Sequence, residues 1–481
     1  MAAPATPRDG RSAPNAPARP RLDPVTRAWA VVTSAGVVRL ALGFVASLVI
    51  ARALGAADFG VYAVLAATVG LVGGLAEGGL TEAAVLRIAA AWPHPPASAQ
   101  SGPAQASPAQ SSPAQARPAS AAAAAEAADR ARAFFWLRLA LATSIVTVGC
   151  LLAEPIASRW LNGQPDLLRW ALIGIVATAA SGAVSAILQA TGAFGRMSSL
   201  TLLNTALTAA LAVVLTASGA LNLLSALIVL GIGTSLVTFV VGRRLLPPTF
   251  SFHPPARRAL TKEAGHLLRT GRWLWLAFLF ATLTANAEVL LLNQWAGLAL
   301  VGAYALALNL ASKADLVNHS LYTVLLPGVA TLHDRHALIA YLRQSLARGA
   351  LIAVGLLLLV PLAPPFINLV YGPDFAPAGH FFQLLVGVMI FDVLATPVLL
   401  LPLAYRQPRL LAAGDATRAV VLIATALALI PLYGAPGAIG ARFASRVAGA
   451  VVVVGLLWLH RPAFEIQHEE SSAVAHKRPA T

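Results

Sequence analysis

The chain has 481 residues, of which 34 are basic and 19 acidic, and its formal net charge is +15. Charged residues make up 11% and hydrophobic residues 58%, whereas about a quarter of a soluble domain is charged. A soluble fold of this length needs a charged, patch-free surface, which so few charges cannot supply. The composition therefore excludes a soluble enzyme, a nucleic-acid-binding protein and a secreted disulfide scaffold. It indicates a polytopic, all-α membrane protein.

Cysteine usage and the N-terminal segment add little chemistry. The single cysteine, Cys150, cannot form an intramolecular disulfide, and no Cys/His cluster has the spacing of metal ligands. We therefore expect no metal and no cofactor. Residues 1–27 are rich in Pro, Ala and Arg and lack an apolar core, which predicts a disordered cytoplasmic tail. An Arg-rich, acid-poor leader also fits a mitochondrial transit peptide, but a full-length span follows directly.

Apolar runs predict about 12 transmembrane helices, because a membrane-spanning helix needs roughly 20 mostly apolar residues. The predicted spans are residues 28–51, 59–85, 134–153, 168–190, 200–218, 221–242, 273–293, 300–330, 350–370, 380–404, 410–430 and 434–459.

The distribution of basic residues predicts the orientation of these spans. With the N-terminus inside, cytoplasmic segments carry 26 of the 34 basic residues and external loops carry 4. The other four, Arg39, Arg138, Lys313 and Arg446, lie within spans. This asymmetry predicts a multi-pass protein with both termini cytoplasmic. The charge of +15 is then explained by basic loops near anionic lipid, without a nucleic-acid partner.

Composition shifts divide the chain into two halves. We expect spans 1–6 to form an N-lobe (28–242) and spans 7–12 a C-lobe (273–459), joined by a basic cytoplasmic linker (243–272) and followed by a cytoplasmic tail (460–481). A low-complexity insert, 93–129, is expected to be a disordered cytoplasmic loop.

The two halves also share a short sequence echo. Gly60-Val61-Tyr62-Ala63 opens the second span, and Gly302-Ala303-Tyr304-Ala305 opens the eighth, 242 residues later. Two halves with equal numbers of spans are typical of transporters.

Four motifs give the chain a family resemblance. Residues 51–62 read ARALGAADFGVY, residues 301–307 VGAYALA, residues 369–375 LVYGPDF and residues 433–440 YGAPGAIG. In this order and on this topology, they resemble the Wzx-like polysaccharide-biosynthesis flippases. These translocate O-antigen and exopolysaccharide units and belong to the multidrug/oligosaccharidyl-lipid/polysaccharide exporter superfamily. The similarity covers about residues 28–460.

The resemblance implies two six-helix lobes around a V-shaped cavity, alternating access, and a bacterial inner-membrane location. It implies a polyprenyl-diphosphate-linked oligosaccharide as cargo, moved from the cytoplasmic to the outer leaflet, with membrane lipid and a polysaccharide synthesis complex as partners. Many such flippases line the cavity with several Arg or Lys residues, and the spans of this chain carry fewer.

Charges within spans are costly and usually face a cavity or a partner side chain. The candidates are Arg39, Glu77, Glu82, Glu288, Lys313, Asp315, His319 and Asp392.

Two cations are candidates for the diphosphate headgroup, because arginine binds phosphate oxygens bidentately and lysine binds them as a point charge. Arg39 lies near the middle of span 1, where it serves as a headgroup site or as half of an ion pair, for instance with Glu77. Lys313 lies one turn after Asn309, and we expect the two to share a cavity-facing side of span 8.

The remaining candidates are carboxylates and one histidine. In span 8, Asp315 and His319 share the opposite face from Lys313, and with the reverse orientation of the helix they become the proton site. Glu288 in span 7 and Asp392 in span 10 serve either ion coupling, as buried carboxylates, or structural hydrogen bonds.

Charges near span ends are assigned differently. We expect Arg87, Arg138 and Arg446 to reach the membrane interface by snorkelling.

The sequence leaves four functions open. A flippase fits Arg39 and Lys313, whereas a proton- or sodium-coupled multidrug exporter of the same superfamily fits an acidic cavity with Glu288 and Asp392. An enzyme such as a polymerase is disfavoured, because the longest external loop, near 154–168, carries only three charges. A membrane scaffold for a synthesis complex stays open.

Overall fold

The structure of the protein is a computed structural model that describes residues 24–77, 79–92, 113–161, 163–314, 321, 325, 335–404 and 408–459. Every regular element in these ranges is helical, which confirms the all-α membrane fold. Within them, nine helices are long and apolar enough to cross a membrane, one of which is the kinked helix α1.

The first nine elements form an N-terminal bundle. They are α1 (Pro24–Glu77), α2 (Leu80–Ala91), α3 (Pro113–Leu151), α4 (Ala153–Trp160), α5 (Pro165–Ala190), α6 (Phe194–Ala217), α7 (Leu223–Ser225), the π-helix η2 (Ala226–Gly233) and α8 (Thr234–Leu245).

The later elements are α9 (Arg257–Trp295) and a C-terminal bundle. The bundle contains α10 (Leu298–Ala314), α12 (Arg335–Leu359), α13 (Ala363–Tyr371), η3 (Pro373–Phe375), α14 (Ala376–Leu399), α15 (Leu401–Ala404), α16 (Pro408–Tyr433) and α17 (Ala435–Leu459).

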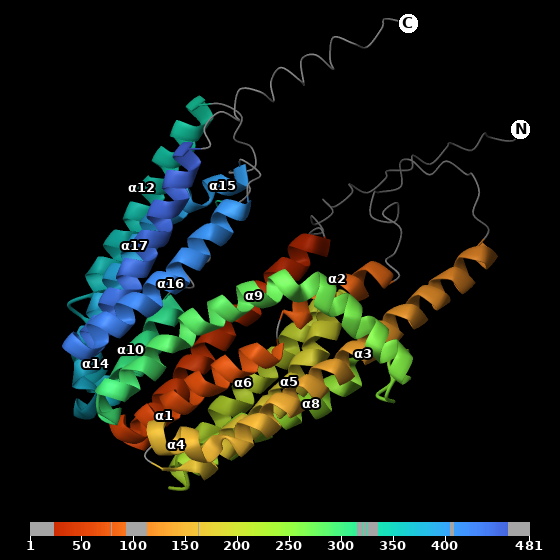
Figure 1. Ribbon diagram of the computed structural model, residues 1–481, viewed down its shortest axis with the longest axis horizontal. Coiled ribbons are helices and arrows are strands. Elements are labelled where there is room, and N and C mark those ends of the chain that lie inside the picture. Colours follow the sequence, from red (N-terminus) through yellow and green to blue (C-terminus); the bar gives the residue numbers. More distant parts are fainter. Residues whose placement is uncertain are drawn as a thin grey trace, which may run out of the picture.

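Helix α1 contains the first two predicted spans. It is interrupted at Gly55, whose φ of 73° and ψ of 172° are not helical. A positive φ is readily adopted only by glycine, so the chain reverses at this residue and the two parts of α1 return side by side (Figure 1).

Two predicted boundaries differ from the structure. Helix α3 begins at Pro113, inside the insert that we expected to be disordered, because the Ala-rich run before the span has high helix propensity and extends it. The ninth span begins near His336 and ends at Leu359, earlier than the predicted 350–370. Exposed Arg343 and Arg348 made its first turns look polar.

The eighth predicted span is only partly described. Helix α10 covers its first part, and most of residues 315–334 lie outside the described residues.

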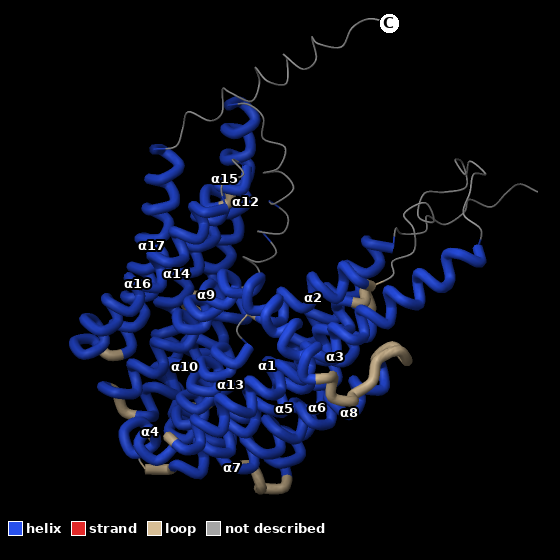
Figure 2. The backbone as a smooth tube through the Cα atoms, turned by 45° about the vertical axis from the view of Figure 1, so that its right-hand side comes forward, coloured by secondary structure: helices blue, strands red, loops and turns tan. Residues whose placement is uncertain are grey.

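The two bundles converge at one end and diverge at the other, as a V (Figure 1). Helix α4 lies at the converging end, and α12 and α17 point away from α3 at the diverging end. Figure 2 shows the same splayed arrangement in a second view, with short loops at the converging end. Helix α9 runs between the bundles and packs against α1 and α2 on one side and α16 and α10 on the other.

The bundles meet where the two copies of the sequence echo cross. A Cβ atom added at Gly60 would lie 2.0 Å from the Leu298 carbonyl oxygen, and one added at Gly302 would lie 2.0 Å from the Ala56 carbonyl oxygen. Each glycine therefore packs against the residue four positions before the other glycine. Gly60 and Gly302 are 242 residues apart in sequence, and so are Ala56 and Leu298. The two contacts are therefore related to each other as by a two-fold axis.

Aromatic and polar contacts surround this crossing. The rings of Phe59 and Phe375 meet edge to face with centroids 5.8 Å apart, so the first and third family motifs are in contact. Arg52 donates to the Val370 carbonyl at 3.4 Å, and Asn293 donates to the Trp160 carbonyl at 2.6 Å. These contacts close the V at its converging end.

Candidate functional site

One of the two predicted headgroup cations, Lys313, lies at the seam between α1 and α10, and the other, Arg39, lies further along α1. Ser47 of α1 donates to Asn309 Oδ1 of α10 at 3.0 Å, and Lys313 also donates to that oxygen. Arg39 lies two turns before Ser47, and Lys313 lies one turn after Asn309. At 1.5 Å per residue they lie about 12 Å and about 6 Å from the Ser47–Asn309 contact. Because α1 and α10 run in opposite directions here, both cations lie on the diverging side of that contact.

Arg39 and Lys313 differ in their surroundings. Arg39 is exposed and has no ion-pair partner among the described residues. Lys313 is half-buried and is held by the amide of Asn309, as the shared face predicted. Arg39 is therefore free to bind an anion, whereas Lys313 is already oriented by a neutral group.

Glu77 pairs with Arg138 rather than with Arg39. Arg138 Nη2 lies 3.1 Å from Glu77 Oε1, and Thr81 accepts from Arg138 at 2.5 Å while donating to Glu77 at 2.9 Å. Arg138 is 6% exposed, so the expectation that it snorkels to the interface was wrong. The guanidinium lies on Gly182, where a Cβ atom would be 2.8 Å from Nη2. The missing side chain makes room for the buried ion pair.

This ion pair lines a cavity of about 460 Å³ between α1, α5 and α9. Its other polar groups are Thr178, Thr282 and Asn286. The wall that belongs to α1 includes Gly70, Gly73 and Gly74. Gly70 and Gly74 let Asn286 and Thr282 of α9 approach closely. Most of the lining of this cavity is apolar, and its one carboxylate is balanced by one arginine.

Glu288 is fully buried and joins three helices. Its Oε2 accepts from Arg442 of α17 at 2.7 and 3.0 Å, and Tyr304 of α10 donates to the same oxygen. The other oxygen, Oε1, is buried and has no hydrogen-bond partner among the described residues. Burying two charges is favourable only when the pair is well bonded, as it is here.

A second cavity, of about 750 Å³, lies between α9, α16 and α17. Glu288 and Arg442 form one part of its wall, and Asp415, Arg418 and Arg446 form another. It shares Ala281 and Ala285 of α9 with the cavity of the N-terminal bundle. One face of α9 thus borders both cavities.

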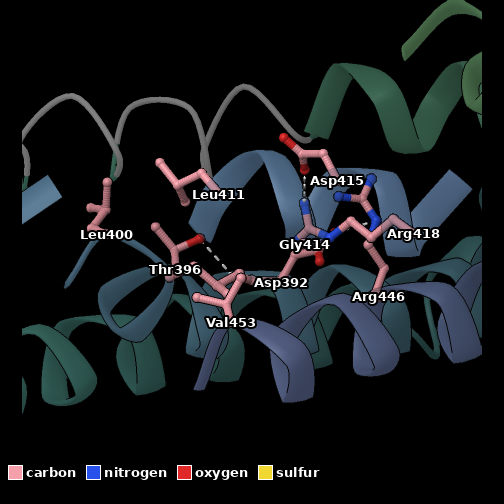
Figure 3. A pocket seen from close by; sticks show the side chains of 10 residues that line it. Asp392, Thr396, Leu400, Leu411, Gly414, Asp415, Arg418, Arg446 and Val453 are labelled. Carbon is pink, nitrogen blue, oxygen red and sulfur yellow. Dashed lines mark hydrogen bonds and ion pairs between the residues drawn. The ribbon is translucent and has the colours of Figure 1, made fainter. Parts of the chain in front are cut away.

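Asp392 and Arg446 line a smaller pocket beside it, of about 270 Å³, between α14, α16 and α17 (Figure 3). Arg446 Nε lies 3.5 Å from Asp392 Oδ2, and Arg418 Nη1 lies 3.2 Å from Asp415 Oδ1. Arg446 therefore faces a pocket with a carboxylate beside it, rather than the membrane interface as we expected.

The structure brings some of the predicted residues together and adds others. Asn309 and Lys313 lie together at the seam between α1 and α10, and Arg39 lies two turns before Ser47 on α1. Glu77, Glu288 and Asp392 occupy three separate ion pairs. Asp315 and His319 lie outside the described residues.

The sequence reasoning missed Arg418 and Arg442 as partners of internal carboxylates. Both lie eight residues inside predicted spans, 410–430 and 434–459, but were counted with the flanking loops. The one available signal was the presence of carboxylates within other spans, since each of these needs a cation nearby.

The charges lining the cavities are therefore arginine–carboxylate pairs. Among the described residues, no group of three or more His, Cys, Asp or Glu side chains could hold a metal ion. The cavities thus offer paired charges and a few hydrogen-bonding groups to a ligand.

Comparison with solved structures identifies the fold. A lipid II flippase, MurJ, in an inward closed conformation matches with a TM-score of 0.66 at 12% identity, covering 89% of this chain and 87% of that one. An inward-facing multidrug resistance MATE family transporter of the MOP superfamily matches with a TM-score of 0.61 at 16% identity, covering 92% and 99%. A MATE transporter of Vibrio cholerae matches with a TM-score of 0.55 at 15% identity, covering 92% and 98%. The protein therefore has the fold of MOP-superfamily membrane transporters.

The family follows from the sequence. The family model described as "Polysaccharide biosynthesis protein" matches residues 123–380, more than half of the chain. The chain belongs to this family of polysaccharide biosynthesis proteins. No curated protein matches it.

Proposed function

We propose that the protein flips a polyprenyl-diphosphate-linked oligosaccharide from the inner to the outer leaflet of a bacterial cell membrane, for surface polysaccharide biosynthesis. The observation that carries this proposal is the charge of the interior. The four carboxylates that line the described cavities, Glu77, Glu288, Asp392 and Asp415, each lie beside an arginine. Arg39, which lines none of these cavities, has no ion-pair partner among the described residues. A membrane-spanning helix thus keeps one cation free for an anionic cargo, while the carboxylates of the cavities are neutralised.

The headgroup binds at the seam between α1 and α10 in this proposal. A diphosphate carries a permanent negative charge, and the guanidinium of Arg39 binds phosphate oxygens bidentately. Lys313, held by Asn309, adds a second positive charge on the same side of the Ser47 contact. The cavity beside Glu77 is large enough for sugar residues, since ligand cavities are typically about 300–1,000 Å³, and Thr178, Thr282 and Asn286 offer them hydrogen-bonding groups.

Transport proceeds by alternating access. We place the diverging ends of the bundles and both termini on the cytoplasmic side, because the basic loops gather there. In this state the cargo enters from the inner leaflet, while the crossing of Gly60 and Gly302 blocks the other side. Rocking of the two lobes, 28–242 and 273–459, then opens the converging end.

A second candidate, an ion-coupled multidrug exporter, is favoured by one observation. Glu288 Oε1 is buried without a partner among the described residues, and such an oxygen can take up a proton or a sodium ion. In this alternative, Glu288→Gln abolishes drug efflux and leaves surface polysaccharide unchanged.

Deletion of the gene in its host tests the proposal. We expect loss of one surface polysaccharide and accumulation of its lipid-linked units on the cytoplasmic side. Complementation with Arg39→Gln should fail, and complementation with Arg169→Gln, a matched exposed arginine paired with Asp166 and Glu154, should succeed. Unchanged polysaccharide with no accumulated lipid-linked units would overturn the proposal. Full activity of the Arg39→Gln variant would favour a scaffold in a synthesis complex.

A further inference from the structure

Two arginines of the C-terminal bundle lie where two cavities meet. Arg418 of α16 and Arg446 of α17 line both the cavity of about 750 Å³ and the pocket of about 270 Å³. Figure 3 shows their side chains close together at one end of the pocket, beside Asp415, with Thr396 and Leu400 toward the other end. Both guanidinium groups are therefore reachable from a space that is large enough for a ligand.

These two arginines are less firmly paired than Arg442. Arg442 makes two bonds to a fully buried carboxylate. Arg418, by contrast, is paired within its own helix with Asp415, whose side chain is 70% exposed, and an exposed ion pair contributes little. Arg446 approaches Asp392 at 3.5 Å, longer than a usual N–H···O bond. Both arginines thus keep donors for a further acceptor.

The packing of α16 on α17 holds the two like charges side by side. A Cβ atom at Gly449 would lie 2.5 Å from Arg418 Cγ and 2.7 Å from its Nε. Gly449 therefore lets the Arg418 side chain lie flat on α17, one turn from Arg446. The Arg418 Nε group is buried and has no hydrogen-bond partner among the described residues. Two neighbouring cations repel each other, and an anion bound by the terminal nitrogens of both guanidinium groups would relieve that repulsion.

We infer that Arg418 and Arg446 form a second anion-binding site, which takes a phosphate or carboxylate group of the transported molecule. It is separate from the α1–α10 seam, since α14, α16 and α17 build it. Guanidinium groups bind both oxyanions through paired N–H donors. The inference rests on the proposed transport function for the source of the anion, which is either the lipid diphosphate or an acidic sugar.

Binding to the purified full-length chain in lipid nanodiscs tests this site. The probes are geranyl diphosphate for the headgroup and glucuronate for an acidic sugar, with glucose as the neutral control. Titration calorimetry is run on the Arg39→Gln/Lys313→Gln variant, in which these two cations cannot contribute to anion binding. Glucuronate is also titrated into the unaltered chain. The Arg418→Gln/Arg446→Gln substitutions are then added, with Arg169→Gln as the matched control.

We expect one of the two anions to bind and its affinity to fall at least tenfold when Arg418 and Arg446 are replaced. Arg169→Gln should change it less than twofold, provided that all variants elute as the same species in size exclusion. The anion that loses affinity identifies the source. Absence of binding by both anions, or binding that survives the double replacement, would overturn the inference. The two proposals can fail separately. If anion binding depends on these arginines but deletion of the gene leaves surface polysaccharide unchanged, the site stands and only the proposed cargo is refuted.

Discussion

The contact between Gly60 and Gly302 predicts that one methyl group opens the converging end of the molecule. In Gly302→Ala, the new Cβ atom would lie 2.0 Å from the Ala56 carbonyl oxygen and 2.9 Å from the Gly60 backbone nitrogen. Both atoms belong to helix backbone and cannot turn aside as a flexible side chain does. The bundles must therefore separate by more than about 1 Å at this crossing, given that carbon–oxygen contacts are made at about 3.3 Å.

The magnitude follows from the cost of overpacking. An extra methylene in a close-packed site costs about 1–3 kcal/mol, and each 1.4 kcal/mol changes an equilibrium tenfold. The state closed at this end should thus lose about 5- to 150-fold in population relative to the state that is open there. Gly60→Ala should act equally, because its Cβ atom meets the Leu298 carbonyl at the same 2.0 Å.

Cysteine labelling measures this shift. Cys150 is replaced by Ser, and a reporter Ser47→Cys is introduced below the crossing, at the α1–α10 seam. A membrane-impermeant maleimide added outside should label this cysteine faster in Gly302→Ala than in the parent. Gly36→Ala is the matched control, since a Cβ atom at Gly36 meets nothing within 4 Å. Equal labelling rates in Gly302→Ala and Gly36→Ala would refute the reasoning.

Three further predictions concern the charged residues. Glu288→Ala leaves Arg442 buried and unpaired, so the free energy of unfolding should fall by about 3–5 kcal/mol; an unchanged melting temperature would contradict the buried ion pair. Arg87→Ala breaks a partly exposed pair with Glu263 at 2.8 Å and should cost no more than about 1 kcal/mol, so a loss as large as that of Glu288→Ala would refute this ranking. Arg39→Ala should lower flipping of a lipid-linked oligosaccharide in proteoliposomes at least tenfold without changing the melting temperature. A drop in melting temperature that accounts for the lost flipping would instead show a structural role.

The sequence predicted the parts of the fold that depend on local properties. Each predicted span follows from the residues of that span and its flanks alone, because a helix in lipid must be apolar over its own length. The placement of basic residues and the Gly-x-Tyr-Ala echo are local patterns of the same kind. This is why the helices of the described part match most of the predicted spans. The ninth span shows the limit, since exposed Arg343 within its first turns hid its start.

The candidate site could be predicted only in part. The charges inside the spans were identifiable as Glu77, Glu288, Arg39 and Lys313, because any such charge is costly in lipid. Their partners were not, because a helix has several faces and sequence alone does not say which one meets a neighbour. Lys313 and Asn309 were the exception, since a spacing of four residues brings side chains together within one helix.

The sequence by itself determined that this chain is a helical membrane protein, because burial in lipid constrains every span separately. Only the tertiary structure decided that Glu288 meets Arg442, 154 residues away, and that Gly60 meets Gly302. These contacts join distant segments, and their geometry depends on how all the helices pack at once. The same packing left Arg39 free of ion pairs among the described residues and placed Arg418 beside Arg446, which is why the function depends on the fold as well as on the composition.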